Sequence, residues 1–240
     1  IDNVLKGGQL PATSFAPPGM FGAVTPGEVG LPSDPAAASA SLQAYLDEQG
    51  ITVEEFSGQG ITLMHNTNEA HAAVAAAIQQ MWKETLGVDV TIENQEWKVY
   101  LQTVKNETPI AEAPHIFRLA WCADYADQNN WVFENFHAEE SENQPRRNCQ
   151  DPNCNSVELT EFDELVKQAQ LSQDPAEREQ LYYDAERILN EEEVAIAPIY
   201  HYTYLEMVKP WLTRSFSPVG GEAFYTWTID EAMQQEALGQ

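Results

Sequence analysis

Basic residues are scarce in this sequence. Its 240 residues include 12 lysines and arginines against 38 aspartates and glutamates, which gives a formal net charge of −26 at pH 7. A field of this sign repels the phosphate backbone of nucleic acids and anionic membrane surfaces. The basic cluster Arg146-Arg147 is too short to reverse it. The composition therefore argues against nucleic acid as a partner and indicates a solvated acidic surface; a high-salt habitat or a preference for cationic ligands would also account for it.

Long apolar runs and familiar enzyme motifs are also missing. No window contains the run of about 18 apolar residues that a membrane-spanning helix needs. The sequence holds no GxSxG nucleophile elbow, P-loop, HExxH or GxGxxG motif. Because 43% of the residues are hydrophobic, the chain can bury a core and is not expected to be disordered. We therefore expect a folded protein that is not an enzyme and that holds neither a cofactor nor a metal.

Cysteine is rare, with Cys122, Cys149 and Cys154 only. The last two lie five positions apart in a polar stretch with turn-forming residues, which favours a disulfide between them. In the chain-entropy model, closing so small a loop stabilises by about 2 kcal/mol. Half of a zinc site with His137 and free thiols remain alternatives, although zinc usually takes four ligands. A disulfide would imply an oxidising compartment.

The central part of the sequence alternates between strand-like and helix-like patterns. Residues 1–33 are rich in proline and glycine, which predicts an extended or looped crossing. The elements expected after it are helices at 34–50, 68–87 and 96–105, and strands at 61–65, 88–92 and 115–121. Strands that alternate with helices predict an α/β lobe with an open, mixed sheet flanked by helices.

The second half of the sequence is expected to be mainly helical. A short helix at 131–136 and a long surface loop precede two amphipathic helices, which begin near Thr160 and at Asp174-Pro175. Residues 194–202 and 204–208 are expected to form strands, and the last 25 residues to leave the lobe.

An acid wedged among aromatic residues is the main candidate for function. Asp124 lies at the end of the strand expected at 115–121, beside Trp121 and Tyr125. Open α/β sheets present ligands at the carboxyl ends of their strands. Asp124 could therefore aim its carboxylate into a cleft at a cationic group, or could merely cap the next helix.

Several segments together resemble one family of transport proteins. They read ITLMHNT at 61–67, WKETLGV at 82–88, ENQEWKVYL at 93–101, WCADY at 121–125, DPAER at 174–178, APIY at 197–200 and VKPW at 208–211. In this order they resemble the C-terminal part of the extracytoplasmic oligopeptide- and dipeptide-binding proteins, solute-binding protein family 5 of ABC transporters.

The resemblance implies roles for individual residues. Asp124 matches the aspartate that holds the α-amino group of the peptide, and Arg118 matches an arginine that meets carboxylates. Trp97 and Trp121 match aromatic residues that line side-chain pockets, and Tyr125, next to Asp124 in the same motif, is a further candidate ligand-binding residue. The remaining match is His71, near the far end of longer ligands. Trp97 and Trp121 could instead be plain core residues, and His71 an exposed residue at a helix start.

Simple geometry favours Asp124 over Arg118 as the anchor of a short peptide. If residues 118–124 are extended, the two side chains stand roughly 20 Å apart, whereas a tripeptide spans only about 10 Å. Both ends of a short peptide are then held only if the chain folds back after Cys122, or if other groups bind the carboxylate.

The resemblance also implies an architecture and a function. It implies a type II periplasmic-binding-protein lobe at 34–216, a remnant crossing from an absent N-terminal lobe at 1–33, and a return crossing at 217–240. The whole protein would capture peptides between two lobes and deliver them to an ABC permease, either in the periplasm or as a lipoprotein on the outer face of the membrane. A nickel, sugar or cationic-osmolyte ligand is the alternative, and a hydrolase using Asp124 with a second acid is a further one.

Overall fold

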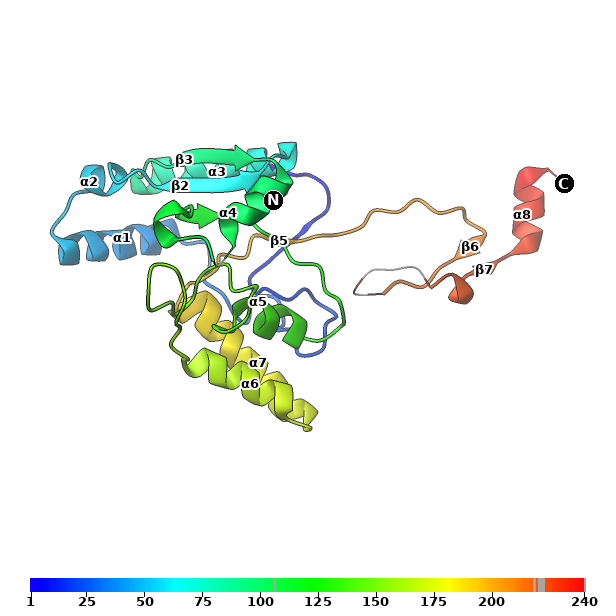
Figure 1. Cartoon of the computed structure of the whole chain (residues 1–240). Coiled ribbons are helices and arrows are strands. Elements are labelled where there is room, and N and C mark those ends of the chain that lie inside the picture. Colours follow the sequence, from blue (N-terminus) through cyan, green and yellow to red (C-terminus); the bar gives the residue numbers. More distant parts are fainter. Residues whose placement is uncertain (106, 218, 220–222, 240) are drawn as a thin grey trace.

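A short parallel sheet forms the centre of the first half of the chain. The computed structural model describes residues 1–105, 107–217, 219 and 223–239. Strands β2 (Thr62–Asn66), β3 (Thr91–Gln95) and β4 (Ile116–Phe117) pair in the order β3-β2-β4, and both pairings are parallel. Figure 1 shows β2 and β3 side by side, with helices on either side of them. The expected α/β class is confirmed; the antiparallel pairings lie in separate two-stranded ribbons.

Alternation along β2 sends consecutive side chains to two different cores. Leu63 packs with Ala75 of α3 (Glu69–Leu86) and with hydrophobic residues of α1 (Pro35–Gln49) and α2 (Val53–Ser57). Met64 faces the other way and packs with Tyr100 of α4 (Trp97–Val104). Because successive side chains of a strand point to opposite faces, β2 is buried on both sides, as a central parallel strand must be.

Local signals in the sequence set the ends of α3. The side chain of Asn68 accepts hydrogen bonds from the backbone N–H groups of Ala70 and His71, which satisfies donors that the helix itself cannot pair. Gly87 closes the helix with φ of 73°, a left-handed conformation that glycine adopts without a steric penalty. The helix therefore begins and ends where the sequence predicts, and its first turn lies at the carboxyl end of β2.

Helices build a further core below the sheet. The antiparallel pair α6 (Glu161–Leu171) and α7 (Pro175–Arg187) packs against a π-helical turn, η2 (Asn129–Phe133), which continues into α5 (Glu134–Phe136). A second π-helical turn, η3 (Ile188–Glu192), extends α7. The fully buried residues of this core are Val132, Phe162, Val166, Ala169, Tyr182, Ala185 and Leu189.

The segment at 10–31 lies against this helical core. Its strand β1 (Leu10–Pro11) pairs with β5 (Tyr200–His201), and the backbone N–H groups of Phe15 and Ala16 donate to the carboxylate of Glu186. Phe21 forms a parallel bridge with Asp127. The segment has almost no regular structure of its own, as its prolines and glycines predict.

Three expected strands are shorter in the structure or do not form, and the strand expected at 88–92 lies at 91–95 instead. Of residues 194–202, only Tyr200 and His201 form a strand, because only they lie beside β1. Only Ile116 and Phe117 of residues 115–121 pair with β2; beyond Arg118 the chain leaves this edge position of the sheet. Residues 204–208 carry no strand and run away from the body into an arm, where Tyr204, Leu205 and Met207 are exposed. The remaining short elements are η1 (Ile110–Glu112), β6 (Leu212–Thr213), η4 (Phe224–Thr226), β7 (Thr228–Ile229) and α8 (Glu231–Leu238). Within the described residues, no helix combines the length and the apolar character needed to cross a bilayer.

Candidate functional site

The carboxyl ends of the parallel strands gather polar side chains at one edge of the sheet. Asn66 ends β2, Gln95 ends β3, Arg118 follows β4, and His71 lies in the first turn of α3. In open α/β sheets this edge is where ligands bind. We therefore take this edge and the chain that continues from it as the candidate site.

Arg118 is held by backbone bonds and by two tyrosines. Its N–H donates to the carbonyl of Met64 at 2.9 Å, and its own carbonyl accepts from the Tyr100 hydroxyl. Its Nη2 donates to the hydroxyls of Tyr200, at 3.2 Å, and Tyr202. No carboxylate of the described residues forms an ion pair with Arg118. The guanidinium is thus oriented by neutral groups and keeps its charge available for an anionic ligand group.

His71 joins the same cluster through Tyr202. Its Nδ1 lies 2.8 Å from the side-chain oxygen of Asn66, and its Nε2 lies 3.3 Å from the Tyr202 hydroxyl. Burial, the positive charge of Arg118 and nearby His65 lower the pKa of His71 to about 4. His71 is therefore neutral at physiological pH and does not compete with Arg118 for an anion.

Trp97 reaches this cluster through Tyr100. It opens α4, is 46% exposed, and stacks on the ring of Tyr100 at 6.1 Å between centroids. Tyr100 in turn donates to the carbonyl of Arg118. The exposed indole is an apolar surface beside the strand ends, which suits a hydrophobic side chain of a ligand.

Asp124 lies in a separate group on the irregular segment that follows β4. Its side chain is exposed, and its carboxylate accepts no hydrogen bond and forms no ion pair within the part of the chain that the structure describes. Its backbone N–H donates to Asn130 Oδ1 at 2.9 Å. The backbone of Asp124 is thus held while its charge is free for a cation.

Trp121 and Tyr125 flank Asp124 and are fixed by the same helical turn. Trp121 Nε1 donates to Asn130 Oδ1 at 3.0 Å, and the side chain packs against the buried cluster of Ala16, Met20 and Trp131. The Tyr125 hydroxyl donates to Glu134 Oε1 and accepts from Asn129 Nδ2 at 2.7 Å. Burial and the hydrogen bond to Glu134 raise the pKa of Tyr125 to about 12, so it stays protonated.

The structure therefore gathers the predicted residues into two groups. Arg118 and His71 meet at Tyr202, and Trp97 adjoins them; Asp124, Trp121 and Tyr125 meet around Asn130 and Glu134. Sequence reasoning missed Asn130, Tyr200 and Tyr202. The doublet Asn129-Asn130 before an apolar run is a weak signal for buried amides, and no pattern links Arg118 to tyrosines more than 80 residues away.

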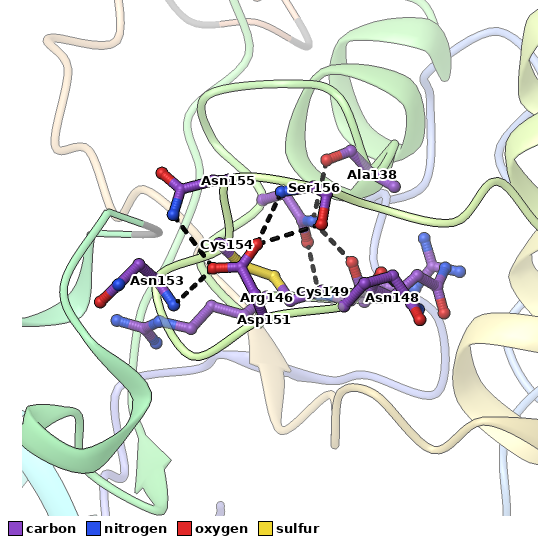
Figure 2. Close-up of a disulfide and its surroundings, with 12 residues drawn as sticks. Ala138, Arg146, Asn148, Cys149, Asp151, Asn153, Cys154, Asn155 and Ser156 are labelled. Atoms are coloured by element: carbon purple, nitrogen blue, oxygen red, sulfur yellow. Dashed lines mark hydrogen bonds between the residues drawn. A yellow bond between two sulfur atoms is a disulfide. The ribbon is translucent and has the colours of Figure 1, made fainter.

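The disulfide between Cys149 and Cys154 closes a surface loop outside both groups. Figure 2 shows it beside Asp151, whose carboxylate accepts from the backbone N–H groups of Asn153 and Ser156 and from the side chain of Asn155. This loop contributes none of the groups around Asp124 or Arg118. In the described residues no cluster of three or more His, Cys, Asp or Glu side chains is placed to hold a metal ion.

Comparison with known proteins gives consistent matches. A model of the bacterial extracellular solute-binding proteins, family 5 (middle region), matches residues 1–143. The chain is 32% identical over 226 residues to the oligopeptide-binding protein OppA of Bacillus subtilis, covering 94% of the chain and 38% of OppA. It is 32% identical over 219 residues to the periplasmic murein peptide-binding protein MppA of Escherichia coli, covering 88% of the chain and 36% of MppA.

Solved structures agree in fold. Haemophilus influenzae OppA in complex with the peptide RPPGFSPFR superposes with a TM-score of 0.68 at 25% identity, over 95% of the chain and 42% of that structure. The open, unliganded form of MppA also gives a TM-score of 0.68, at 29% identity, over 91% of the chain and 38% of that structure. The chain thus has the fold of part of a type II periplasmic binding protein and spans about 38% of the length of OppA from Bacillus subtilis.

Proposed function

Because the chain belongs to the bacterial extracellular solute-binding proteins of family 5, we propose that it supplies one wall of the peptide-binding cleft in the substrate-binding component of an ABC importer. Members of this family bind substrates rather than transform them, and the chain is not an enzyme. The proposal goes further in three respects: the ligand is a peptide, Asp124 holds its amino end, and the loaded protein delivers it to a permease.

The observation that carries this proposal is the state of Asp124. Its carboxylate is exposed and free of protein partners among the described residues, while Asn130 fixes its backbone. A charge-assisted hydrogen bond from a peptide ammonium to this carboxylate contributes about 1.5–3 kcal/mol. The neighbouring Trp121 and Tyr125 offer aromatic surface to the first side chain of the peptide.

The Arg118 cluster supports a second contact. Its guanidinium has no anionic partner in the described part of the chain and stands at the strand ends with neutral His71. It would bind a carboxylate of the peptide, either the terminal one or that of an acidic side chain. Peptide main chain lying between the two groups would gain hydrogen bonds that do not depend on sequence.

The rest of the cleft would come from a second lobe. The chain spans 38% of the length of OppA from Bacillus subtilis, and in the mechanism that we propose two lobes close about a hinge over the ligand. The closed form would be the one that a permease recognises. The relatives include proteins described as periplasmic, which supports a location of this protein outside the cytoplasm.

Titration of the chain with trialanine tests the amino-end contact. One wall of a cleft should bind weakly, with a dissociation constant on the order of 1 mM, equivalent to about −4 kcal/mol. In ¹H–¹⁵N NMR spectra we expect shifts of the backbone signals of residues 121–125 and of the Asn130 side-chain amide. N-acetyl-trialanine, which lacks the ammonium, should leave these signals in place.

Matched variants locate the contact. Asp124→Asn should abolish the difference in signal shifts between the two peptides. Asp47→Asn changes a different exposed aspartate, which lies on α1, and should preserve that difference. Equal shifts with the acetylated peptide would contradict the role of Asp124. Micromolar affinity from this chain alone would contradict the one-wall picture, and larger shifts with glycine betaine than with trialanine would favour a cationic osmolyte as ligand.

A further inference from the structure

We propose that Asn130 is the positioning residue of the amino-end site, holding Asp124 and Trp121 in the arrangement that receives a peptide ammonium. This inference rests on the peptide-binding function proposed above. Asn130 itself does not touch the ligand, because its side chain is completely buried.

Both the oxygen and the nitrogen of the Asn130 side chain form hydrogen bonds within this site. Oδ1 accepts from the backbone N–H of Asp124 at 2.9 Å and from Trp121 Nε1 at 3.0 Å, while Nδ2 donates to Glu134 Oε2 at 2.6 Å. Two N–H donors require an oxygen on one side, and a carboxylate requires a donor on the other. The amide therefore has a single orientation, and both Asp124 and Trp121 depend on it.

Asn130 lies in a buried helical turn, whereas Asp124 lies on an irregular, exposed segment. Asn130 lies in the π-helical turn η2, whose residues Trp131, Val132 and Phe133 are buried in two cores. Asn135 Nδ2 donates back to the carbonyl of Asn130 at 3.0 Å. A π-helical turn inserts an extra residue into a helix and commonly occurs at functional sites. Here it turns Asn130 toward the irregular segment that carries Asp124.

Loss of the amide should misplace the site without removing its charge. Asn130→Ala leaves the N–H groups of Asp124 and Trp121 without their acceptor, but the Asp124 carboxylate stays in the protein. We expect about tenfold weaker binding of trialanine, the effect of leaving buried donors unpaired. The preference for trialanine over its N-acetyl form should fall with it.

A reciprocal exchange of amide and carboxylate tests this geometry more sharply. Asn130→Asp keeps the acceptor for Asp124 and Trp121 but places a second carboxylate against Glu134, where a donor stood at 2.6 Å. Adding Glu134→Gln restores a donor from the opposite side and returns the net charge to its original value. Together with Glu134→Gln alone, these variants form a double-mutant cycle.

The single Asn130→Asp variant should bind trialanine about tenfold more weakly. The double variant should recover the affinity and the preference for the free amino group to within about twofold of the original protein, because all three hydrogen bonds are again possible. Failure of the double variant to recover, while it folds and the single variant is impaired, would overturn the proposal.

The matched control is Asn143→Ala. Asn143 is also a buried asparagine that bonds its surroundings through both side-chain groups, in the loop next to Arg147. Thermal unfolding should show that both alanine variants are destabilised, but only Asn130→Ala should lose the preference for the free amino group. It should also lose the hydrogen-exchange protection of the Trp121 indole N–H.

The outcomes separate this inference from the function on which it rests. If the original chain shows no preference for trialanine over the acetylated peptide, the peptide-binding proposal itself fails. If the original chain shows the preference and Asn130→Ala keeps it, with the Trp121 indole still protected, then Asn130 is merely structural. Should Asn130→Ala not fold, the comparison of Asn130→Asp with its double variant decides the question.

Discussion

At the scale of single residues, the hydroxyl of Tyr202 connects Arg118 and His71 at the carboxyl ends of the strands. Tyr202 accepts from Arg118 Nη2 and lies 3.3 Å from His71 Nε2, and Tyr200 donates to it at 3.4 Å. Because the oxygen of Asn66 faces His71 Nδ1, the proton of a neutral His71 sits on Nδ1, and Tyr202 donates to Nε2. A second proton, on Nε2, would oppose the hydrogen bond that Tyr202 donates to this nitrogen. It would also place a positive charge on His71 near that of Arg118.

We therefore expect His71 to titrate well below an ordinary histidine. Its pKa should be about 4, against the ordinary 6.5, when followed by NMR of its ring carbons. Arg118→Gln should raise this pKa because it removes a nearby positive charge, while burial continues to hold it below 6.5. Lys83→Gln, at the far end of α3, should leave it unchanged. Titration of His71 near 6.5 in the original protein would refute the arrangement.

Glu186 is a buried acid that ties the N-terminal segment to α7. Its carboxylate accepts from the N–H groups of Phe15 and Ala16 and from the side-chain amides of Gln128 and Asn190. Burial nevertheless raises its pKa above the ordinary 4.5. Among the described residues, the oxygens of both amides lack partners, so rotation of either amide offers an acceptor to a proton on Glu186.

The raised pKa predicts a definite pH dependence. The folded protein keeps the Glu186 proton to higher pH than the unfolded chain does, so the contribution of Glu186 to the unfolding free energy should fall as the pH rises from 4.5 through the folded-state pKa. In urea unfolding, the unfolding free energy of the original protein minus that of Glu186→Gln, which cannot titrate, should fall over that range. Glu179→Gln, on the exposed side of α7, should leave the pH dependence unchanged. If the original protein instead gains stability relative to Glu186→Gln as the pH rises over that range, the assignment is wrong.

The sequence indicates which residues carry charge at the site, but not which other residues fix these charged residues in place through hydrogen bonds. Asp124 is predictable because an acid among aromatics follows a strand, and the family resemblance points to the same residue. Asn130 escapes prediction because its role depends on a π-helical turn, which the apolar pattern of residues 131–136 does not reveal. Tyr200 and Tyr202 escape it because their contacts to Arg118 span more than 80 residues and exist only in the folded chain.

At the scale of elements, helices were more predictable than strands. The helix ends follow local chemistry: Asp34 and Asp174 cap helices that begin with proline, and Gly50 and Gly87 end helices in the left-handed conformation. Strand length instead depends on a partner. Residues 115–121 have strand-like composition throughout, yet only Ile116 and Phe117 lie beside β2. The same reason explains why residues 204–208 form no strand.

The loop closed by Cys149 and Cys154 should add measurable stability. The structure joins the two sulfurs across five positions of the chain, and in the chain-entropy model so small a loop contributes about 2 kcal/mol. Cys149→Ser/Cys154→Ser should lower the unfolding free energy by about that amount in urea titrations. Cys122→Ser, at the exposed free cysteine, should leave it unchanged. An unchanged stability of the double variant would mean that the loop is already ordered by the hydrogen bonds of Asp151.

At the scale of the whole molecule, the described cores and ion pairs take up only part of the apolar surface and of the acidic charge. The body buries two main cores, whereas the arm after Tyr202 exposes Tyr204, Leu205, Met207 and Tyr225. The net charge of −26 is spread over a chain of 240 residues, and the described ion pairs engage only a few of its acids. Folding therefore brings many like charges closer together, which opposes the compact state.

This self-repulsion predicts that salt stabilises the protein. Raising the ionic strength from about 0.01 to about 1 M shortens the screening length from about 30 to about 3 Å. We expect Tm to rise on the order of 5 °C, which corresponds to about 2 kcal/mol for a chain of this size. Scanning calorimetry in NaCl and in NaSCN separates charge screening from effects specific to one anion. Screening at low concentrations depends on ionic strength and not on the identity of the anion.

Charge-reversed variants test the same claim without added salt. Glu48→Lys and Glu179→Lys change exposed residues, and together they reduce the net negative charge by four units. Glu48→Lys also places a cation near the C-terminal end of α1, where the helix dipole favours it. The double variant should be more stable than the original protein at low salt, and its Tm should depend less on NaCl. If instead Tm is insensitive to low concentrations of salt in both proteins, repulsion among the acids does not limit the stability of the fold.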